Sequence, residues 1–274
     1  MLDLVVLGIV QGLTEFLPVS STAHLLFAEH YLGLPRPGIV LEAALHMGTT
    51  VAAVILFWSD IVRLLKATVH AALHPLLRGR TTATAYDLEG PYRRLAAAIV
   101  AATAVTAGLG LLFANPLERM FESVRGAAYQ LIVTGAILLW HRERGVRSAT
   151  DATVADGVML GLAQALSIIP GISRSAVTIV AGLALGLRRA EAARLSFLVA
   201  IPAILGAGLF GFKDMDRATA AGYTLLQLLM GFAVAAGVGA AAILWLLGLV
   251  RRGRLVVFSA YCWLVGVLVL ATTR

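Results

Sequence analysis

The sequence predicts an all-α polytopic membrane protein with about six transmembrane helices and two re-entrant helical hairpins in an inverted repeat. Of its 274 residues, 59% are hydrophobic and only 14% are charged, whereas soluble domains contain about 25% charged residues. Long apolar segments recur along the whole chain, and two of them are interrupted halfway by polar patches that contain proline. This combination is typical of a membrane protein with a polar site inside it.

Six apolar segments are roughly long enough to cross about 30 Å of hydrocarbon at about 1.5 Å per residue. We expect them near Val40–Ser59, Leu95–Ala114, Gly126–Trp140, Leu195–Phe212, Gly222–Val250 and Leu255–Thr272. Because no long polar linker separates two cores, we expect one integral membrane domain over residues 1–274. Within it, one repeat should cover about 1–141 and the other about 154–272.

Two further apolar stretches, Leu2–Leu34 and Val154–Leu187, are each broken at mid-length. The polar patch is Thr14–Ser21 in the first stretch and Pro170–Ser175 in the second. Each half is too short to span, so we expect each stretch to enter the bilayer, break and return to the same side. Broken backbone at membrane depth is tolerated only inside protein or beside a water-filled cavity.

The basic residues predict the orientation. A net charge of +7 can indicate nucleic acid binding, but here the Lys and Arg side chains lie between apolar segments, which is how membrane proteins are oriented. With both termini outside, most of the 22 Lys and Arg residues fall in four cytoplasmic loops. These are Arg63, Lys66, Arg78, Arg80, Arg93 and Arg94; Arg142, Arg144 and Arg147; Arg188, Arg189 and Arg194; and Arg251, Arg252 and Arg254. We therefore expect a multi-pass membrane protein with both termini outside and with the first interrupted stretch entering the bilayer from outside.

The N-terminus and the single cysteine add two expectations. Asp3 stands where a signal peptide has basic residues, and Gln11 and Glu15 interrupt the apolar run, so we expect no cleaved signal peptide. Cys262 is the only cysteine, which excludes an internal disulfide.

An internal similarity supports the repeat. The offset that places Gly8 on Gly161 also places Gln11 on Gln164 and Ser20 on Ser173. Three spans separate the two copies, so the second copy enters from the opposite face, as in inverted-repeat membrane proteins with a site at the repeat interface. Chance similarity between two helices rich in Gly, Ala and Leu is the alternative.

The first polar patch contains candidate catalytic residues. Gln11 and Glu15 are four residues apart and share a helix face. A carboxylate at membrane depth is costly and needs a partner or a function, unless it lies at the water interface. Ser20 and Ser21 are followed by His24. A helix beginning near Pro18 would place Ser21 beside His24. This is the arrangement of a nucleophile with its general base, or of a phosphate-binding hydroxyl beside a proton donor. The sequence leaves open whether Ser21 attacks or orients a water held by Glu15; the alternative to both is that one serine simply caps the helix.

The second patch is a candidate anion site. Arg174 lies in an apolar segment without a nearby acidic residue in the sequence, and buried charges are paired or functional. Ser173, Ser175 and Thr178 surround it, so the patch resembles an anion cradle at a helix start. The alternative is that Arg174 pairs with Glu15. We expect His46, inside a predicted span, to be a packed core histidine.

At this level of detail the chain resembles a known family. Residues 11–24, from Gln11 to His24, resemble the first signature of bacterial undecaprenyl-diphosphate phosphatases of the bacitracin-resistance type. Residues 170–178 resemble their second signature, and the stretch Leu195–Pro202 also fits the family. The resemblance covers essentially the whole chain. It implies an enzyme of the bacterial inner membrane that removes one phosphate from a polyprenyl diphosphate and so recycles the lipid carrier for peptidoglycan synthesis. With the orientation predicted above, its active site faces outside.

The resemblance also implies roles for particular residues. Glu15, with Gln11, matches the pair placed at a divalent cation, Mg²⁺ or Ca²⁺. The remaining matches are the catalytic patch Ser20, Ser21 and His24, and the phosphate-binding patch Ser173, Arg174, Ser175 and Thr178. Gln11 stands where many members have Glu, which should weaken cation binding, and Ala176 stands where Gly is usual.

Two other functions stay open. A transporter that flips the polyprenyl phosphate would use the inverted repeat equally well, alone or together with hydrolysis; release of inorganic phosphate separates the two. A structural scaffold would leave Glu15, His24 and Arg174 without a role. As partners we expect the bilayer, the polyprenyl diphosphate lipid and possible homodimer formation, without nucleic acid.

Overall fold

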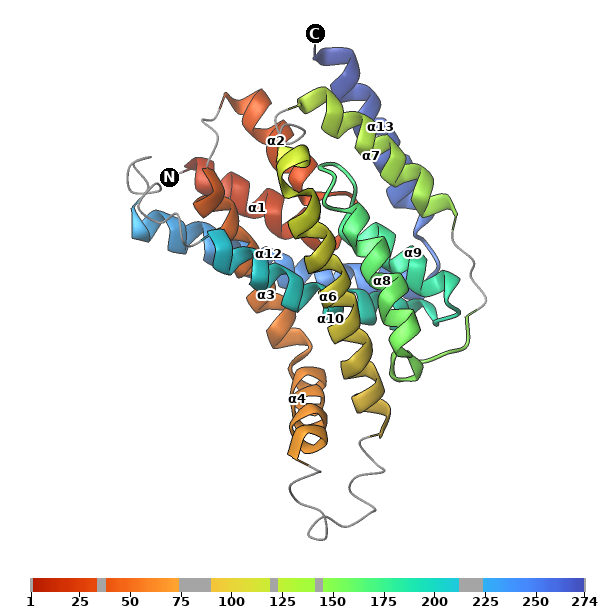
Figure 1. Cartoon of the computed structure of the whole chain (residues 1–274). Coiled ribbons are helices and arrows are strands. Elements are labelled where there is room, and N and C mark those ends of the chain that lie inside the picture. Colours follow the sequence, from red (N-terminus) through yellow and green to blue (C-terminus); the bar gives the residue numbers. More distant parts are fainter. Residues whose placement is uncertain are drawn as a thin grey trace.

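Helices make up almost all of the part of the chain that the structure describes (Figure 1). The structure, a computed structural model, describes residues 2–33, 38–73, 90–118, 123–140, 145–211 and 224–273. Its helices are α1 (Leu2–Phe16), α2 (Ser21–Leu32), α3 (Gly38–Leu56), α4 (Trp58–Leu73), α6 (Gly90–Glu118), α7 (Val124–Leu139), η2 (Ala149–Asp151), α8 (Val154–Leu166), α9 (Arg174–Ala184), α10 (Arg189–Gly211), α12 (Leu225–Arg251) and α13 (Val256–Thr272). The predicted loop residues Arg78, Arg80, Arg142 and Arg144 and the predicted span ends Phe212 and Gly222 lie outside the described residues.

Each of the six predicted spans overlaps a helix of the structure, and Val40–Ser59 overlaps two, α3 and α4. By length and apolar composition, α6, α10 and α12 can each cross a membrane alone. The helices α3 and α4, with an 81° bend between them, have the length and composition of a fourth span if the pair is counted as one, or of a re-entrant loop. The predicted span Val40–Ser59 therefore runs past the bend, which lies at Phe57. The helices α7 and α13 have 16 and 17 residues, about 24–26 Å at about 1.5 Å per residue. The prediction of an all-α polytopic membrane protein is confirmed.

Both interrupted stretches form helical hairpins. In the first, α1 ends at Phe16 and α2 begins at Ser21, because Pro18 disfavours helical backbone at the residue before it. In the second, α8 ends at Leu166 and α9 begins at Arg174. The two helices of each hairpin pack against each other, so the predicted breaks are confirmed.

The first helix of each hairpin packs closely on a long helix from the other half of the chain. In the first hairpin the first helix, α1, packs on α12. In the second hairpin the first helix, α8, packs on α6. A Cβ added at Gly8 would come within 3.0 Å of the Gly231 carbonyl oxygen, and one at Gly161 within 2.7 Å of the Ala102 carbonyl oxygen. Such small residues let helices approach closely in membranes, where association depends on packing.

An apolar core joins the two hairpins. Phe16, at the end of α1, packs edge-to-face on Phe197 of α10 with ring centroids 5.5 Å apart. Ile179 of α9 belongs to the same core, and all three side chains are almost fully buried. The residue before Phe16 is therefore held deep inside the helical assembly.

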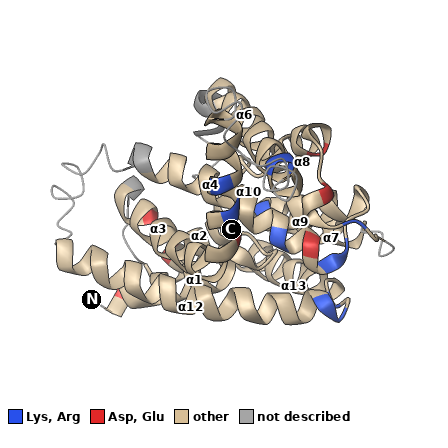
Figure 2. Cartoon of the chain, turned by 90° about the horizontal axis from the view of Figure 1, so that it is seen from below, with Lys and Arg blue, Asp and Glu red and all other residues tan. Residues whose placement is uncertain are grey.

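The predicted cytoplasmic loops meet at one end of the molecule. Arg194, on α10, donates to Asp60, on α4, from both Nε and Nη2. The guanidinium of Arg189 lies against Gly253, and Arg147 binds Asp156 with an Nη2–Oδ2 distance of 2.6 Å. Figure 2 shows blue segments around α4, α8, α9 and α10, whereas the left part of α12, near the N-terminus, has none.

We predict that Gly157→Ala lowers the thermal unfolding midpoint of the purified protein by several degrees. A Cβ at Gly157 would lie 2.2 Å from the Ala98 carbonyl oxygen, and overpacking of this kind costs about 1–3 kcal/mol. The matched control is Gly108→Ala, where nothing lies within 4 Å of the added Cβ. It should be neutral or slightly stabilising, because Ala favours helix over Gly by about 1 kcal/mol. Equal midpoints for the two variants would contradict the α6–α8 packing.

Candidate active site

Glu15 lies at the centre of the polar contacts between the hairpins. Its side chain is 2% exposed, on the last turn of α1. Gln11, one turn earlier on the same face and 0% exposed, donates from Nε2 to Glu15 Oε2 at 2.8 Å. The shared face predicted for these two residues is present, and Glu15 is buried within the protein.

The first turn, residues 17–20 between α1 and α2, brings a hydroxyl group to the same carboxylate. Ser20 has a φ of 66°, a left-handed conformation that is uncommon for residues other than glycine. Its hydroxyl accepts from the Ala23 N–H at 3.4 Å and caps α2. Ser21, the next residue, donates from Oγ to Glu15 Oε2 at 2.6 Å. The strained residue thus reverses the chain so that Ser21 reaches back to Glu15.

His24 has other partners than the predicted Ser21. Its Nδ1 lies 2.8 Å from the Ser20 carbonyl oxygen, and its Nε2 lies 2.9 Å from the Tyr261 hydroxyl. Since the carbonyl only accepts, Nδ1 carries the proton and Nε2 can accept from Tyr261. The two rings also stack, with centroids 5.6 Å apart. Tyr261, on α13, was missed by the sequence analysis, because no local pattern connects it with His24.

The second turn, residues 167–173 between α8 and α9, is held in place by hydrogen bonds to a hydroxyl group. Thr134, on α7, donates to the Gly171 carbonyl at 3.0 Å and accepts from the Ser173 N–H at 3.1 Å. Gly171 has a φ of +100°, and a Cβ there would lie 2.6 Å from the Ala127 carbonyl oxygen. Glycine is therefore required both by the backbone conformation and by the close approach of α7.

The predicted phosphate-binding hydroxyls contact protein groups. Ser173 Oγ accepts from the Ala176 N–H and lies 3.1 Å from Ser175 Oγ. Ser175 donates to the Leu17 carbonyl of the first turn at 3.0 Å. Thr178 donates to the Arg174 carbonyl at 2.8 Å, and its Oγ1 lies 2.6 Å from the hydroxyl of Ser196, on α10. These contacts shape the second turn and attach it to the first.

Arg174 joins the two turns electrostatically. Its Nη2 donates to Glu15 Oε1 in an ion pair between residues far apart in the chain. The ion pair between Arg174 and Glu15, which the sequence offered as an alternative to an anion site, is therefore present. Arg174 is the more exposed partner, with 18% of its side chain accessible. A guanidinium has five N–H donors, so this side chain has the capacity to hold phosphate oxygens as well.

His46 belongs to this cluster too. Its Nε2 lies 3.4 Å from Glu15 Oε2, and its side chain is 26% exposed. The expectation of a packed core histidine is therefore wrong. The available signal was the presence of an ionisable residue inside a predicted span, which indicates a functional site by default.

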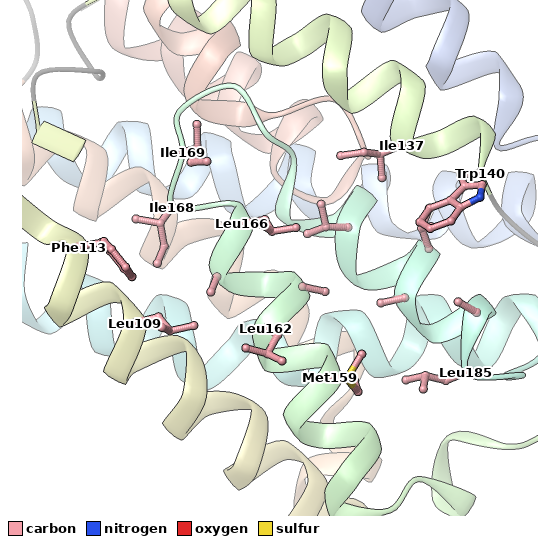
Figure 3. Close-up of a pocket in the computed structure, with 16 residues that line it drawn as sticks. Leu109, Phe113, Ile137, Trp140, Met159, Leu162, Leu166, Ile168, Ile169 and Leu185 are labelled. Atoms are coloured by element: carbon pink, nitrogen blue, oxygen red, sulfur yellow. The ribbon is translucent and has the colours of Figure 1, made fainter. Parts of the chain in front are cut away.

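An apolar cavity of about 1070 Å³ lies beside the second turn, between α6, α7, α8 and α9. Figure 3 shows Ile168 and Ile169 of the turn on one side of it, with Leu109 and Phe113 of α6 and Ile137 and Trp140 near the end of α7 around it. Val177 also lines it, next in sequence to Thr178. The cavity thus begins where the polar second turn ends.

The residues at Glu15 fit a divalent cation in part. Gln11 donates to Glu15 from Nε2, and its Oε1 is buried without a hydrogen-bond partner. The amide oxygen is therefore free to serve as a metal ligand. Among the described residues, no three His, Cys, Asp or Glu side chains come together as a metal site. One carboxylate and one amide oxygen suit an ion that takes its other ligands from phosphates and water, as Mg²⁺ often does.

Comparison with known proteins identifies the family. The chain matches the bacitracin resistance protein BacA family over residues 4–268. A protein of Rubrobacter xylanophilus named undecaprenyl-diphosphatase is 40% identical over 275 residues, covering 99% of this chain and 97% of its own. An undecaprenyl-diphosphatase of Methanobrevibacter smithii is 38% identical over 268 residues, covering 97% of this chain and 95% of its own. With this coverage at nearly full length, and with both signature turns meeting in one site, the chain belongs to the bacitracin resistance protein BacA family.

Proposed function

We propose that this protein hydrolyses the terminal phosphoanhydride of undecaprenyl diphosphate, or a similar polyprenyl diphosphate, to the monophosphate and inorganic phosphate. The observation that supports this most directly is the position of the Glu15 carboxylate, which accepts a hydrogen bond from the Ser21 hydroxyl and forms an ion pair with Arg174. Relatives of nearly equal length are named for this activity. The reaction regenerates the lipid carrier of peptidoglycan synthesis, and this recycling accounts for resistance to bacitracin.

In the proposed reaction Ser21 Oγ attacks the terminal phosphorus and its proton passes to Glu15, 2.6 Å away. The bond from that phosphorus to the bridging oxygen breaks, and the polyprenyl monophosphate leaves. Water then hydrolyses the phosphoserine, which releases inorganic phosphate and restores Ser21. Arg174 holds the phosphate oxygens and stabilises the charge that develops on them.

The other polar residues have supporting roles in this proposal. His24, with Tyr261 on its Nε2, transfers protons at the leaving oxygen. Ser20, Ser173, Ser175 and Thr178 keep the two turns in shape, because their hydroxyls already bind protein groups. A Mg²⁺ or Ca²⁺ ion would be held by Glu15 and the free oxygen of Gln11 and would supply charge neutralisation at the phosphates.

The apolar cavity is proposed to hold the first part of the prenyl chain. Its lining is hydrocarbon from four helices, and it starts at the residues that directly precede Pro170 of the second turn. A diphosphate at Arg174 would therefore have an apolar path for its tail on the neighbouring side of the same turn.

We also propose that the two hairpins are inverted repeats with the site opening outside. The equivalent glycines, Gly8 and Gly161, make equivalent contacts, the first with α12 and the second with α6. In Figure 2 the Lys and Arg segments lie from the centre to the right of the view, away from the N-terminus, and we expect the side of the molecule that carries them to be the cytoplasmic side.

We predict that the purified protein releases inorganic phosphate from farnesyl diphosphate and that both Ser21→Ala and Glu15→Gln lower kcat by about 10³-fold or more. Loss of a nucleophile or of its base removes stabilisation specific to the transition state. Thr103→Val is the control, because this hydroxyl bonds only to the Ile99 carbonyl of its own helix. Phosphate is measured colorimetrically, with and without excess EDTA.

Three results would count against these assignments. Undiminished activity of Ser21→Ala would exclude Ser21 as the nucleophile. Full activity in excess EDTA would exclude the divalent cation. Lipid movement between leaflets without any phosphate release would favour the flippase instead.

We predict that Ala181→Trp raises KM for undecaprenyl diphosphate at least several-fold and changes KM for farnesyl diphosphate much less. Ala181 lines the cavity, so an indole there would occupy space needed by the longer chain. Ala233→Trp, on an exposed position of α12, is the control. An equal effect on both substrates would place the tail elsewhere.

We predict that Ser21→Cys, in a Cys262→Ser background, reacts with a membrane-impermeant thiol reagent added outside intact cells. Cysteines introduced as Arg147→Cys or Arg252→Cys should react only after the membrane is opened, because these positions belong to the basic end. The reverse labelling pattern would overturn the orientation.

A further inference from the structure

The exposed side of α4 carries an apolar stripe. Trp58, Leu65, Val69 and Leu73 are 60%, 59%, 51% and 41% exposed. Spacings of seven, four and four residues place these side chains on one face of the helix. The opposite face packs on α6, and Ala67 on that face is fully buried. Within the described residues, the stripe therefore points away from the protein.

A basic stripe runs beside the apolar one. Arg63, Lys66 and His70 are all exposed, and at about 100° per residue they lie about a quarter of a helical turn away from the apolar stripe. The only acidic residue of α4 is Asp60, which is buried and receives two hydrogen bonds from Arg194. The exposed side of the helix therefore carries positive charge without a negative charge of its own.

The bend after α3 places this side of α4 near the surface of the bilayer. The helix α3 has 19 residues, about 28 Å at about 1.5 Å per residue, and so covers nearly the whole of about 30 Å of hydrocarbon by itself. The helix α4 departs from that direction by 81° (Figure 1). If α4 instead continued the span, the exposed Arg63 and Lys66 would lie in hydrocarbon, which is very costly. Trp58, at the start of α4, is a residue type typical of the membrane interface.

We propose that α4 lies in the headgroup region of one leaflet, with its apolar stripe among the acyl chains and with Arg63 and Lys66 bound to the phosphates of anionic phospholipids. Helices that lie at the bilayer surface combine an apolar face with Lys and Arg on the polar face, and each basic residue near an anionic leaflet adds electrostatic attraction. The bilayer is the occupant that the surroundings favour, because α4 packs on α6, which can itself cross a membrane. This inference does not depend on the proposed hydrolysis.

Arg63 is held in position for such a contact. Its Nη1 donates to the Tyr92 hydroxyl, on α6, at 2.9 Å, and its guanidinium carbon lies 5.5 Å from the centre of the same ring. A guanidinium has five N–H donors, so the remaining donors can bind a lipid phosphate while α6 orients the side chain. Lys66, three residues later, adds a second cation on the same stripe.

The test measures how deeply α4 enters the bilayer. Val69→Cys and His70→Cys, each in a Cys262→Ser background, are labelled with a nitroxide and reconstituted as full chains in phosphatidylcholine vesicles with or without phosphatidylglycerol. Power-saturation electron paramagnetic resonance then compares collisions with oxygen, which concentrates in hydrocarbon, and with a water-soluble nickel chelate. We expect the oxygen-to-nickel ratio at the Val69→Cys label to exceed that at the His70→Cys label several-fold, because the two neighbouring residues lie on different stripes.

The dependence on lipid charge tests the basic stripe. Phosphatidylglycerol should raise the ratio at the Val69→Cys label by at least about twofold, and Arg63→Gln combined with Lys66→Gln should abolish that rise. Arg251→Gln combined with Arg252→Gln, the matched control, removes the same charge at the end of α12 and should leave the rise unchanged. Lys66→Gln alone should reduce the rise, which keeps the test valid if loss of the contact between Arg63 and α6 unfolds the double variant.

Three results would overturn the proposal. Nickel accessibility above oxygen accessibility at both labels would place α4 in water, with its apolar stripe open to a protein partner instead. High oxygen accessibility at both labels would place α4 inside the hydrocarbon as part of a span. A ratio that does not depend on phosphatidylglycerol, or a rise that survives the removal of both Arg63 and Lys66, would exclude the anionic lipid site.

Discussion

The ion pair between Glu15 and Arg174 is the interaction on which the rest of the site depends. A carboxylate and a guanidinium inside an apolar helical assembly are both costly, and each makes the other tolerable. Because one lies at the end of α1 and the other at the start of α9, the pair requires the two hairpin turns to meet. In the proposed reaction a phosphate competes with Glu15 for Arg174. Substrate binding would then separate Arg174 from Glu15, while Gln11, Ser21 and His46 keep the carboxylate in place to accept the proton of Ser21.

Broken helices leave backbone groups without helical partners, and in an apolar protein these groups need other partners. The structure provides them with short side chains. Thr134 donates to the Gly171 carbonyl and accepts from the Ser173 N–H. Ser175 donates to the Leu17 carbonyl of the first turn. Hydroxyl groups that the sequence suggested as phosphate ligands thus have a structural task, which leaves Arg174 as the main candidate for holding the anion.

The site draws on helices that are remote in sequence. Glu15 receives contacts from its own helix, from Ser21 of α2, from His46 of α3 and from Arg174 of α9. His24 depends on Tyr261 of α13. A carboxylate with this many neighbours is held in one position, and such preorganisation is what electrostatic catalysis requires.

The sequence by itself determined which segments leave water and where they break. Apolar length predicted the helices, and Pro18, Pro170 and Gly171 predicted the two turns, because their backbone restrictions are local. The pairing of Glu15 with Arg174 was one of two alternatives, since a buried charge needs a partner but does not specify which one. Tyr261, Thr134 and His46 were decided only by the tertiary structure. Their contacts depend on how whole helices pack, for example α1 on α12 through Gly8, and such packing arises from surfaces that no short stretch of sequence contains.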